Sequence, residues 1–139
     1  MAEPTVTADP EVFPVPRPNL TPGDVVRIQV EALADNDLPY RDAGIETVFR
    51  FMAPVTRQQV GSIRHFIQVV NNPIYRCCID HQSVRYSAVR VKERTALRAL
   101  ILSSSVSGKE VGFVFSLERQ HAPPHRDCWM TRSVRRVAV

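Results

Sequence analysis

The sequence predicts an α+β protein, because the period of its apolar residues changes from helical to extended near Pro73. Before that position, apolar side chains recur every three or four residues in three segments. After it, apolar and polar side chains alternate in four long segments with mostly short connections, a pattern typical of antiparallel strands. We therefore expect three N-terminal helices packed on one face of a curved antiparallel sheet of four or more strands.

The first helix is expected to begin at Thr21, where three residues together form a helix-start signal. A threonine N-cap, Pro22 at the first helical position and Asp24 at the third satisfy free amides and the positive end of the helix dipole. An apolar stripe at helical spacing follows, and the polar run at 35–37 together with Pro39 ends the helix. The stripe consists of Val25, Ile28, Val30 and Leu33, with Val26 and Ala32 beside it.

Two further helices are expected before the period changes. The second covers 43–52 and is stopped by Pro54, and the third covers 57–70 and is ended by the Asn-Asn-Pro run at 71–73. The expected strands cover 82–92, 95–106, 110–120 and 128–138. The clearest turn between strands is Ser107-Gly108.

The chain of 139 residues is long enough for one domain, and its proline content divides it into two parts. Five of the 11 prolines lie within 1–20 and favour an extended polyproline conformation there. We expect a Pro-rich arm at 1–20 and an α+β domain at 21–139. The arm is either a disordered tail or a segment held by the domain or by a partner, through its apolar residues Val12, Phe13 and Val15.

The charge also differs between the two parts. The formal net charge is +4, and three acidic residues and one arginine in 1–20 leave a net +6 on the rest of the chain. Such a body suits an acidic partner surface. Nucleic acid is not the expected partner, because no aromatic residues are interleaved with the cations. Arg132, Arg135 and Arg136 form either the outward or rim face of the last strand or a patch for acidic protein or lipid head groups.

Composition and cysteine content restrict the compartment. No run of about 18 apolar residues is present, so we expect a soluble protein without a transmembrane segment. Three cysteines, two of them adjacent, make a poor disulfide framework and favour free thiols in a reducing compartment. The interior of a chloroplast or mitochondrion, reached after removal of a transit peptide, and a bacterial cytoplasm both fit.

Three segments carry a resemblance to a known family. They are Thr-Pro-Gly-Asp-Val-Val at 21–26, Asp-Ala-Gly-Ile-Glu-Thr-Val-Phe-Arg-Phe at 42–51 and Cys-Trp-Met-Thr at 128–131. Residues 20–137 resemble the SnoaL-like, or nuclear-transport-factor-2-like, superfamily, and within it a family of small proteins of bacteria and photosynthetic eukaryotes without an assigned activity. The resemblance implies a cone-shaped barrel in which helices cap a strongly bent sheet, and it implies no particular chemistry.

The resemblance also implies where a ligand would bind, since enzymes of the superfamily place an acid or base inside the cone. Residues that we expect to line such a cavity are Arg50, Tyr75, His81, Tyr86 and Trp129. No two of them have a spacing that demands catalysis, so no catalytic residue is assigned.

One set of residues has the chemistry of a zinc site. Cys78-x-x-His81 and His125-x-x-Cys128 together offer two thiolates and two imidazoles. The long stretch of chain between the two pairs argues against a compact site, and we therefore expect neither a metal nor another cofactor.

These observations favour a non-catalytic interaction or scaffold module, an accessory subunit of a larger assembly that docks through its arm and its basic body. The alternative is a small-molecule-binding protein, or an isomerase-like or hydrolase-like enzyme, that uses the cavity of the cone. A homodimer through the open sheet face is compatible with either hypothesis.

Overall fold

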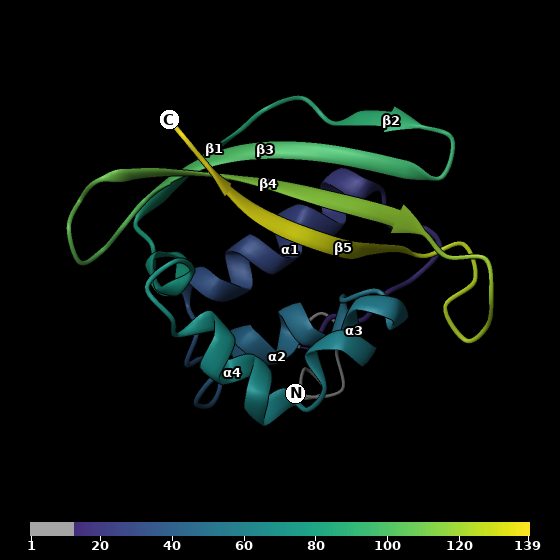
Figure 1. Ribbon diagram of the computed structural model, residues 1–139, viewed down its shortest axis with the longest axis horizontal. Coiled ribbons are helices and arrows are strands. Elements are labelled where there is room, and N and C mark those ends of the chain that lie inside the picture. The colour runs from purple at the N-terminus through teal and green to yellow at the C-terminus, as the bar shows by residue number, and fades with distance from the viewer. Residues whose placement is uncertain (1–12) are drawn as a thin grey trace, which may run out of the picture.

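Within residues 13–139, which a computed structural model describes, four helices cover one face of a five-stranded antiparallel sheet (Figure 1). The helices are α1 (Pro22–Ala34), α2 (Ala43–Arg50), α3 (Pro54–Val60) and α4 (Ile63–Val70), followed by a 3-10 turn at Arg76–Cys78. The strands are β1 (Ser83–Tyr86), β2 (Arg90–Lys92), β3 (Thr95–Ser103), β4 (Glu110–Arg119) and β5 (Trp129–Val137). The predicted α+β class is confirmed, and the candidate residue Val12 lies outside the described part.

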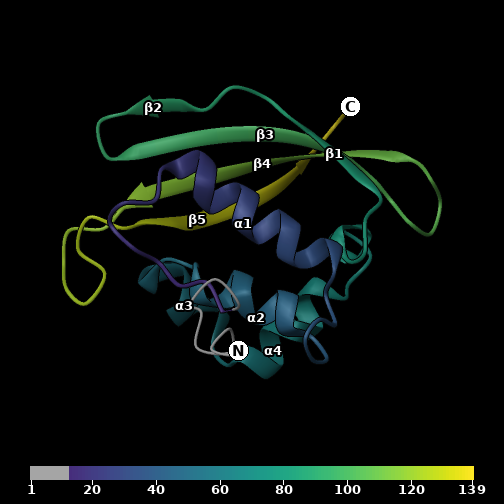
Figure 2. The ribbon, with the colours of Figure 1, turned by 180° about the vertical axis from the view of Figure 1, so that it is seen from behind.

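The start of α1 is capped as the sequence predicts. The Thr21 hydroxyl accepts a hydrogen bond from the Asp24 amide at 3.0 Å, and the Asp24 carboxylate accepts one from the Thr21 amide at 3.0 Å. This reciprocal arrangement satisfies two amides that would otherwise lack a partner. In Figure 2, α1 crosses the inner face of the sheet and α2 lies beyond it.

The predicted third helix, 57–70, is wrong in detail, because the structure divides this region into α3 and α4. Pro54, which was expected only to stop the second helix, is the first residue of α3. Gly61 has a φ of +85°, a conformation that favours glycine, and it ends α3. Ser62 then caps α4, accepting a hydrogen bond from the His65 amide at 3.1 Å.

The end of the second helix also differs from the prediction, since α2 ends at Arg50 and not at Met52. The chain beyond α2 pairs with β5 instead. The Thr131 amide donates to the Phe51 carbonyl and the Ala53 amide donates to the Thr131 carbonyl, each at 2.8 Å. These hydrogen bonds anchor the start of α3 against the sheet.

The sheet order is β1-β3-β4-β5, and β2 pairs with β3 on the same side as β1. The single strand expected at 82–92 is therefore two strands. Ser87 causes the interruption, because its hydroxyl, in place of a backbone carbonyl, accepts the hydrogen bond of the Ala99 amide at 3.0 Å. The Ser87 carbonyl accepts a hydrogen bond from the Arg98 guanidinium instead, at 3.1 Å.

A close approach between α1 and α2 fixes the helical layer. A Cβ atom on Gly44 would lie 2.3 Å from the Ala32 carbonyl oxygen, so only glycine fits this position. Beside it, the buried Asn36 accepts from the Gly44 amide through its carbonyl at 2.8 Å and from the Ile45 amide through its side chain at 3.0 Å. The polar run that ends α1 thus also holds the start of α2.

The core lies between the helices and the inward faces of β3 and β4. Among its most buried members are Val25, Val26, Ile45, Phe51, Phe113 and Leu117. Across the part of the chain that the structure describes, no helix has the length and apolar character needed to cross a membrane.

Candidate functional site

A cavity of about 300 Å³ lies where α2, α3 and α4 face β5, and it is called the helix–sheet cavity below. Most of its lining is apolar and comes from segments that are distant in the sequence. Its apolar walls include Leu33, Val48, Met52, Phe66, Val70, Phe115 and Val134. The core therefore does not fill the space under the helices completely, and apolar contact area remains for a small molecule.

One hydroxyl in this cavity is held in a defined orientation. Thr131 lines the cavity, and its Oγ1 accepts a hydrogen bond of 2.7 Å from Nε2 of Gln29 on α1. The same Nε2 donates to the Val25 carbonyl at 3.1 Å, so the opposite amide orientation would place two oxygens against each other. The Thr131 hydroxyl oxygen thus accepts the hydrogen bond from Gln29. The hydrogen of the same hydroxyl remains free to be donated to another acceptor.

Gln29 itself is fully buried, with 0% of its surface exposed, and its Oε1 has no hydrogen-bond partner among the described residues. A buried amide oxygen without a partner is unfavourable unless water or a ligand satisfies it. Gln29 thus lies behind the cavity lining and holds the Thr131 hydroxyl in place.

Three further polar groups of the cavity have partners within the protein. The Tyr75 hydroxyl donates to the Val134 carbonyl at 3.1 Å, and the Thr56 hydroxyl donates to the Arg132 carbonyl at 2.7 Å. The Cys78 thiol also lines the cavity, and its hydrogen bond with Cys77 together with burial raises its pKa above the usual range. The Cys78 thiol therefore stays protonated near neutral pH.

The neighbouring thiol of Cys77 has the opposite character. A hydrogen bond from Cys78 and the charge of Arg136 outweigh partial burial and lower the pKa of Cys77 to about 6. Cys77 and Arg136 share one neighbour, because the Cys77 sulfur lies 3.8 Å and the Arg136 guanidinium 3.3 Å from the Ile74 carbonyl oxygen. Cys77 is half-buried, and its lowered pKa favours the thiolate form at neutral pH. Burial raises the pKa of Cys128, the third cysteine.

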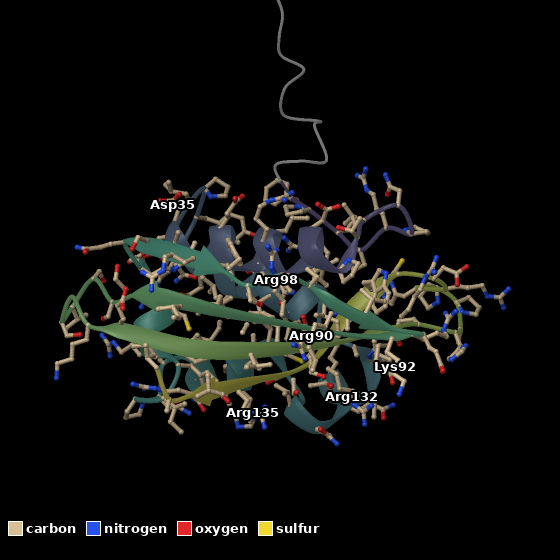
Figure 3. All side chains as sticks on the ribbon, turned by 90° about the horizontal axis from the view of Figure 1, so that it is seen from above. Asp35, Arg90, Lys92, Arg98, Arg132 and Arg135 are labelled. Atoms are coloured by element: carbon tan, nitrogen blue, oxygen red, sulfur yellow. The ribbon has the colours of Figure 1, made fainter. Side chains whose placement is uncertain are left out.

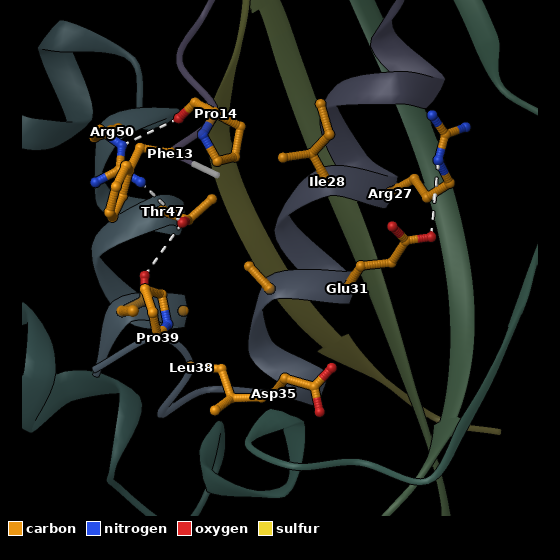
Figure 4. A pocket seen from close by; sticks show the side chains of 13 residues that line it. Phe13, Pro14, Arg27, Ile28, Glu31, Asp35, Leu38, Pro39, Thr47 and Arg50 are labelled. Carbon is orange, nitrogen blue, oxygen red and sulfur yellow. Dashed lines mark hydrogen bonds and ion pairs between the residues drawn. The ribbon is translucent and has the colours of Figure 1, made fainter. Parts of the chain in front are cut away.

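A second pocket, of about 620 Å³, lies between α1, α2 and the described end of the arm, and is called the arm groove below (Figure 4). Arg50 Nε donates to the Pro14 carbonyl at 3.1 Å, and the ring of Phe13 stacks on Tyr40 with centroids 6.2 Å apart. Residues 13–14 of the arm thus pack against their own chain. The groove is polar and carries charges of both signs, which include Arg27, Glu31, Asp35 and Arg50.

The five residues expected to line one cavity are not brought together. Arg50 lines the arm groove, Tyr75 lines the helix–sheet cavity, and Tyr86 lines a third pocket beside β3. His81 and Trp129 are buried and line none of these three pockets. His81 Nδ1 instead lies 2.8 Å from the Cys78 carbonyl oxygen, so its polar contact is with the backbone.

The four residues considered for zinc also lie apart. Cys78 and His81 precede β1. The start of β1 pairs with the end of β3, which in turn pairs with the beginning of β4. His125 and Cys128 precede β5, and the start of β5 pairs with the end of β4. The length of β4, roughly 30 Å, separates the two ends. Within residues 13–139 there is no group of three or more His, Cys, Asp or Glu residues placed to hold a metal ion.

The C-terminal arginines do not share one face. Arg135 pairs with Val114 on the outward side of β5, whereas the adjacent Arg136 reaches the Ile74 carbonyl on the helix side. Arg132 is ion-paired with Glu118 at 3.2 Å. Neighbouring residues of a strand point to opposite faces, so this patch is divided by the strand itself.

Gln29 and Thr131 are absent from the sequence-based candidates. A signal existed for Gln29, which lies four residues from both Val25 and Leu33 and therefore on the apolar stripe of the first helix. A polar residue at such a position needs a buried partner.

Comparisons of the chain with protein-family models, with curated proteins and with solved structures found no match.

Proposed function

We propose that this protein is a non-catalytic binding protein for a small, uncharged, apolar molecule that carries one hydrogen-bond acceptor. The main observation in support of this proposal is the helix–sheet cavity, in which the oriented hydroxyl of Thr131 lies among apolar side chains. Ligand pockets are commonly apolar with a few placed polar groups, and a volume of about 300 Å³ suits a small ligand. The ligand body contacts the apolar walls, and its carbonyl or hydroxyl oxygen accepts the Thr131 hydrogen.

An uncharged ligand follows from the lining. A charged group would lose its hydration in the cavity and would find no free charge of opposite sign there. Arg132 is a charged residue of the lining, and its guanidinium forms an ion pair with Glu118 at 3.2 Å. Among the described side chains that line the cavity there is no carboxylate, imidazole or amine that could act as a general acid or base.

We further propose that the fold is the cone-shaped barrel of the SnoaL-like superfamily. The helical layer on one face of an antiparallel sheet, with a cavity between them, agrees with that arrangement. The compartment, whether an organelle interior or a bacterial cytoplasm, stays a prediction from composition.

The test is a titration with prodan, an apolar naphthalene ketone whose fluorescence shifts to the blue in an apolar site. We expect saturable binding with one site per chain. Val134→Trp fills the cavity and should abolish it, whereas Val106→Trp places the same ring on a position that is 86% exposed and should leave it unchanged. Unchanged binding in Val134→Trp, or no binding to the wild type, would overturn the proposal.

The polar anchor is tested separately. Thr131→Val removes the donor to the ligand carbonyl and should weaken prodan binding by about two- to tenfold, the effect of one neutral hydrogen bond. Thr131→Ser keeps the hydroxyl and should bind nearly as well as the wild type. Equal affinities of Thr131→Val and Thr131→Ser would show that the hydroxyl does not contact the ligand.

A further inference from the structure

The side of the sheet that faces away from the helices is called the outer sheet face below, and Figure 3 views the molecule from this side. The register of β3 and β4 places Leu97, Ala99, Ile101 and Val114 on this face, opposite in direction to the buried residues of the core. Leu97 is 48% exposed. Two adjacent strands thus present a stripe of apolar side chains to solvent.

Cations flank this stripe on both edges of the sheet. Arg90 and Lys92 lie on β2 and pair with Leu97 and Thr95, and Arg135 lies on β5 and pairs with Val114. All three are exposed, and none forms an ion pair with any described residue.

The two acidic residues that β4 places on this face are already ion-paired. Glu110 pairs with Arg85 at 2.7 Å, and Glu118 pairs with Arg132 at 3.2 Å. The outer sheet face therefore has an excess of positive charge, arranged as two basic edges about an apolar centre.

We propose that the outer sheet face is a docking surface for an acidic protein segment, one in which carboxylates flank apolar side chains. The apolar residues of the segment would cover the central stripe, and its carboxylates would meet the unpaired cations of β2 and β5. Apolar burial in the centre with complementary charges at the rim is the usual composition of a protein interface. The proposal is independent of the ligand proposed for the helix–sheet cavity.

A second copy of this chain does not fit the same surface. A two-fold interface brings the same patch of both copies together, and both edges of this patch are basic. Cations would then oppose cations, which disfavours the pairing. The charge pattern therefore favours a different, acidic chain over the homodimer expected from an open sheet.

Single-stranded nucleic acid also fits less well. A nucleic-acid surface combines cations with aromatic side chains on which bases stack. The central stripe of this face is aliphatic, and its cations are separated by the width of two strands. A phosphate backbone could follow one edge only and would leave the apolar centre uncovered.

The test uses a fluorescein-labelled peptide in which glutamate alternates with leucine, and a matched peptide in which lysine replaces glutamate. Fluorescence anisotropy should show salt-sensitive binding of the acidic peptide and none of the basic one. Arg90→Glu combined with Arg135→Glu should weaken this binding by about tenfold, since two attractions become repulsions. Arg41→Glu combined with Arg64→Glu, at exposed positions on the helical side, should leave it unchanged.

Three further measurements separate the alternatives. Leu97→Asp should also weaken peptide binding, whereas Val134→Trp, which fills the cavity, should not. Tighter binding of a single-stranded oligonucleotide than of the acidic peptide would overturn the proposal in favour of nucleic acid. Sedimentation that shows a dimer disrupted by Leu97→Asp would overturn it in favour of a second copy.

Discussion

Gln29 and Thr131 are separated by 102 positions in the chain, yet the amide nitrogen of one lies 2.7 Å from the hydroxyl oxygen of the other. The hydrogen bond joins α1 to β5 at the wall of the helix–sheet cavity. It lies in the buried interior, where a polar group without a partner is costly. The same pair therefore contributes to the stability of the fold and orients the hydroxyl proposed to bind the ligand.

The stability of this contact can be measured by urea unfolding. Thr131→Val leaves one Gln29 hydrogen without its acceptor and should lower the free energy of unfolding by about 1–3 kcal/mol. Thr131→Ser keeps the acceptor and should lose less. Adding Gln29→Leu to Thr131→Val removes both polar partners and should restore part of the lost stability. A double variant that is less stable than Thr131→Val alone would contradict this account.

Gly44→Ala tests the close approach of α1 and α2. The added methyl group would lie 2.3 Å from the Ala32 carbonyl oxygen and 2.8 Å from the Asn36 side-chain oxygen, so the helices must move apart. We expect a loss of about 3 kcal/mol in the free energy of unfolding, at the upper end for overpacking. Gln68→Ala, on the exposed side of α4, is the control and should change stability by under about 0.5 kcal/mol. A Gly44→Ala variant as stable as this control would show that the helices separate easily.

The contact between the arm and the domain is tested by limited proteolysis with proteinase K. In the wild type, the contacts of Phe13 and Pro14 should protect the chain from about residue 13 onward. Phe13→Ala should allow trimming towards the start of α1, with little change in global stability because Phe13 is 42% exposed. Val15→Ala changes another exposed arm residue and serves as the control. Identical fragments from all three proteins would mean that the Phe13–Tyr40 contact does not hold the arm.

The reactivity of Cys77 depends on pH in a defined direction. Its lowered pKa, about 6, means that the thiolate is present above that pH, whereas an ordinary cysteine ionises near pH 8.5. Alkylation of Cys77 by iodoacetamide should therefore rise with a midpoint well below pH 8, while Cys78 and Cys128 react slowly. Mass spectrometry of the alkylated protein locates each modified residue.

Two arginine variants show whether the nearby charge contributes. Arg136→Ala should raise the pKa of Cys77 and shift the midpoint upward, because the cation that favours the thiolate is lost. Arg135→Ala removes the adjacent cation on the outer sheet face and should leave the midpoint in place. A wild-type midpoint near pH 8.5 would contradict the proposed environment of Cys77.

Local signals in the sequence predicted local structure well. The Thr21 cap, the change of period at Pro73 and the alternation in β3 and β4 depend on near neighbours, and each has its expected counterpart. The errors arose where tertiary contacts decide. Apolar residues keep a helical period across Gly61 and hide the end of α3, and the Ser87 hydrogen bond that divides β1 from β2 requires β3 as a partner.

The candidate site was largely beyond prediction from sequence for a related reason. Its walls come from four helices, the 3-10 turn and two strands, so no spacing along the chain identifies them. Tyr75 was the one expected cavity residue that lines it, whereas Arg50 and Tyr86 belong to other pockets. The polar pair that distinguishes the cavity needs both the α1 stripe and the register of β5, and the second is fixed only in the folded sheet.

Methyl NMR spectra recorded during a titration with prodan test the central claim most directly, because they locate the bound molecule. The account predicts saturable shifts at Val48, Val70 and Val134, which line the helix–sheet cavity, with none at Leu97 or Ile101 on the outer sheet face. Shifts confined to Leu97 and Ile101, or no saturable shifts at the cavity valines, would contradict a ligand site between the helices and the sheet.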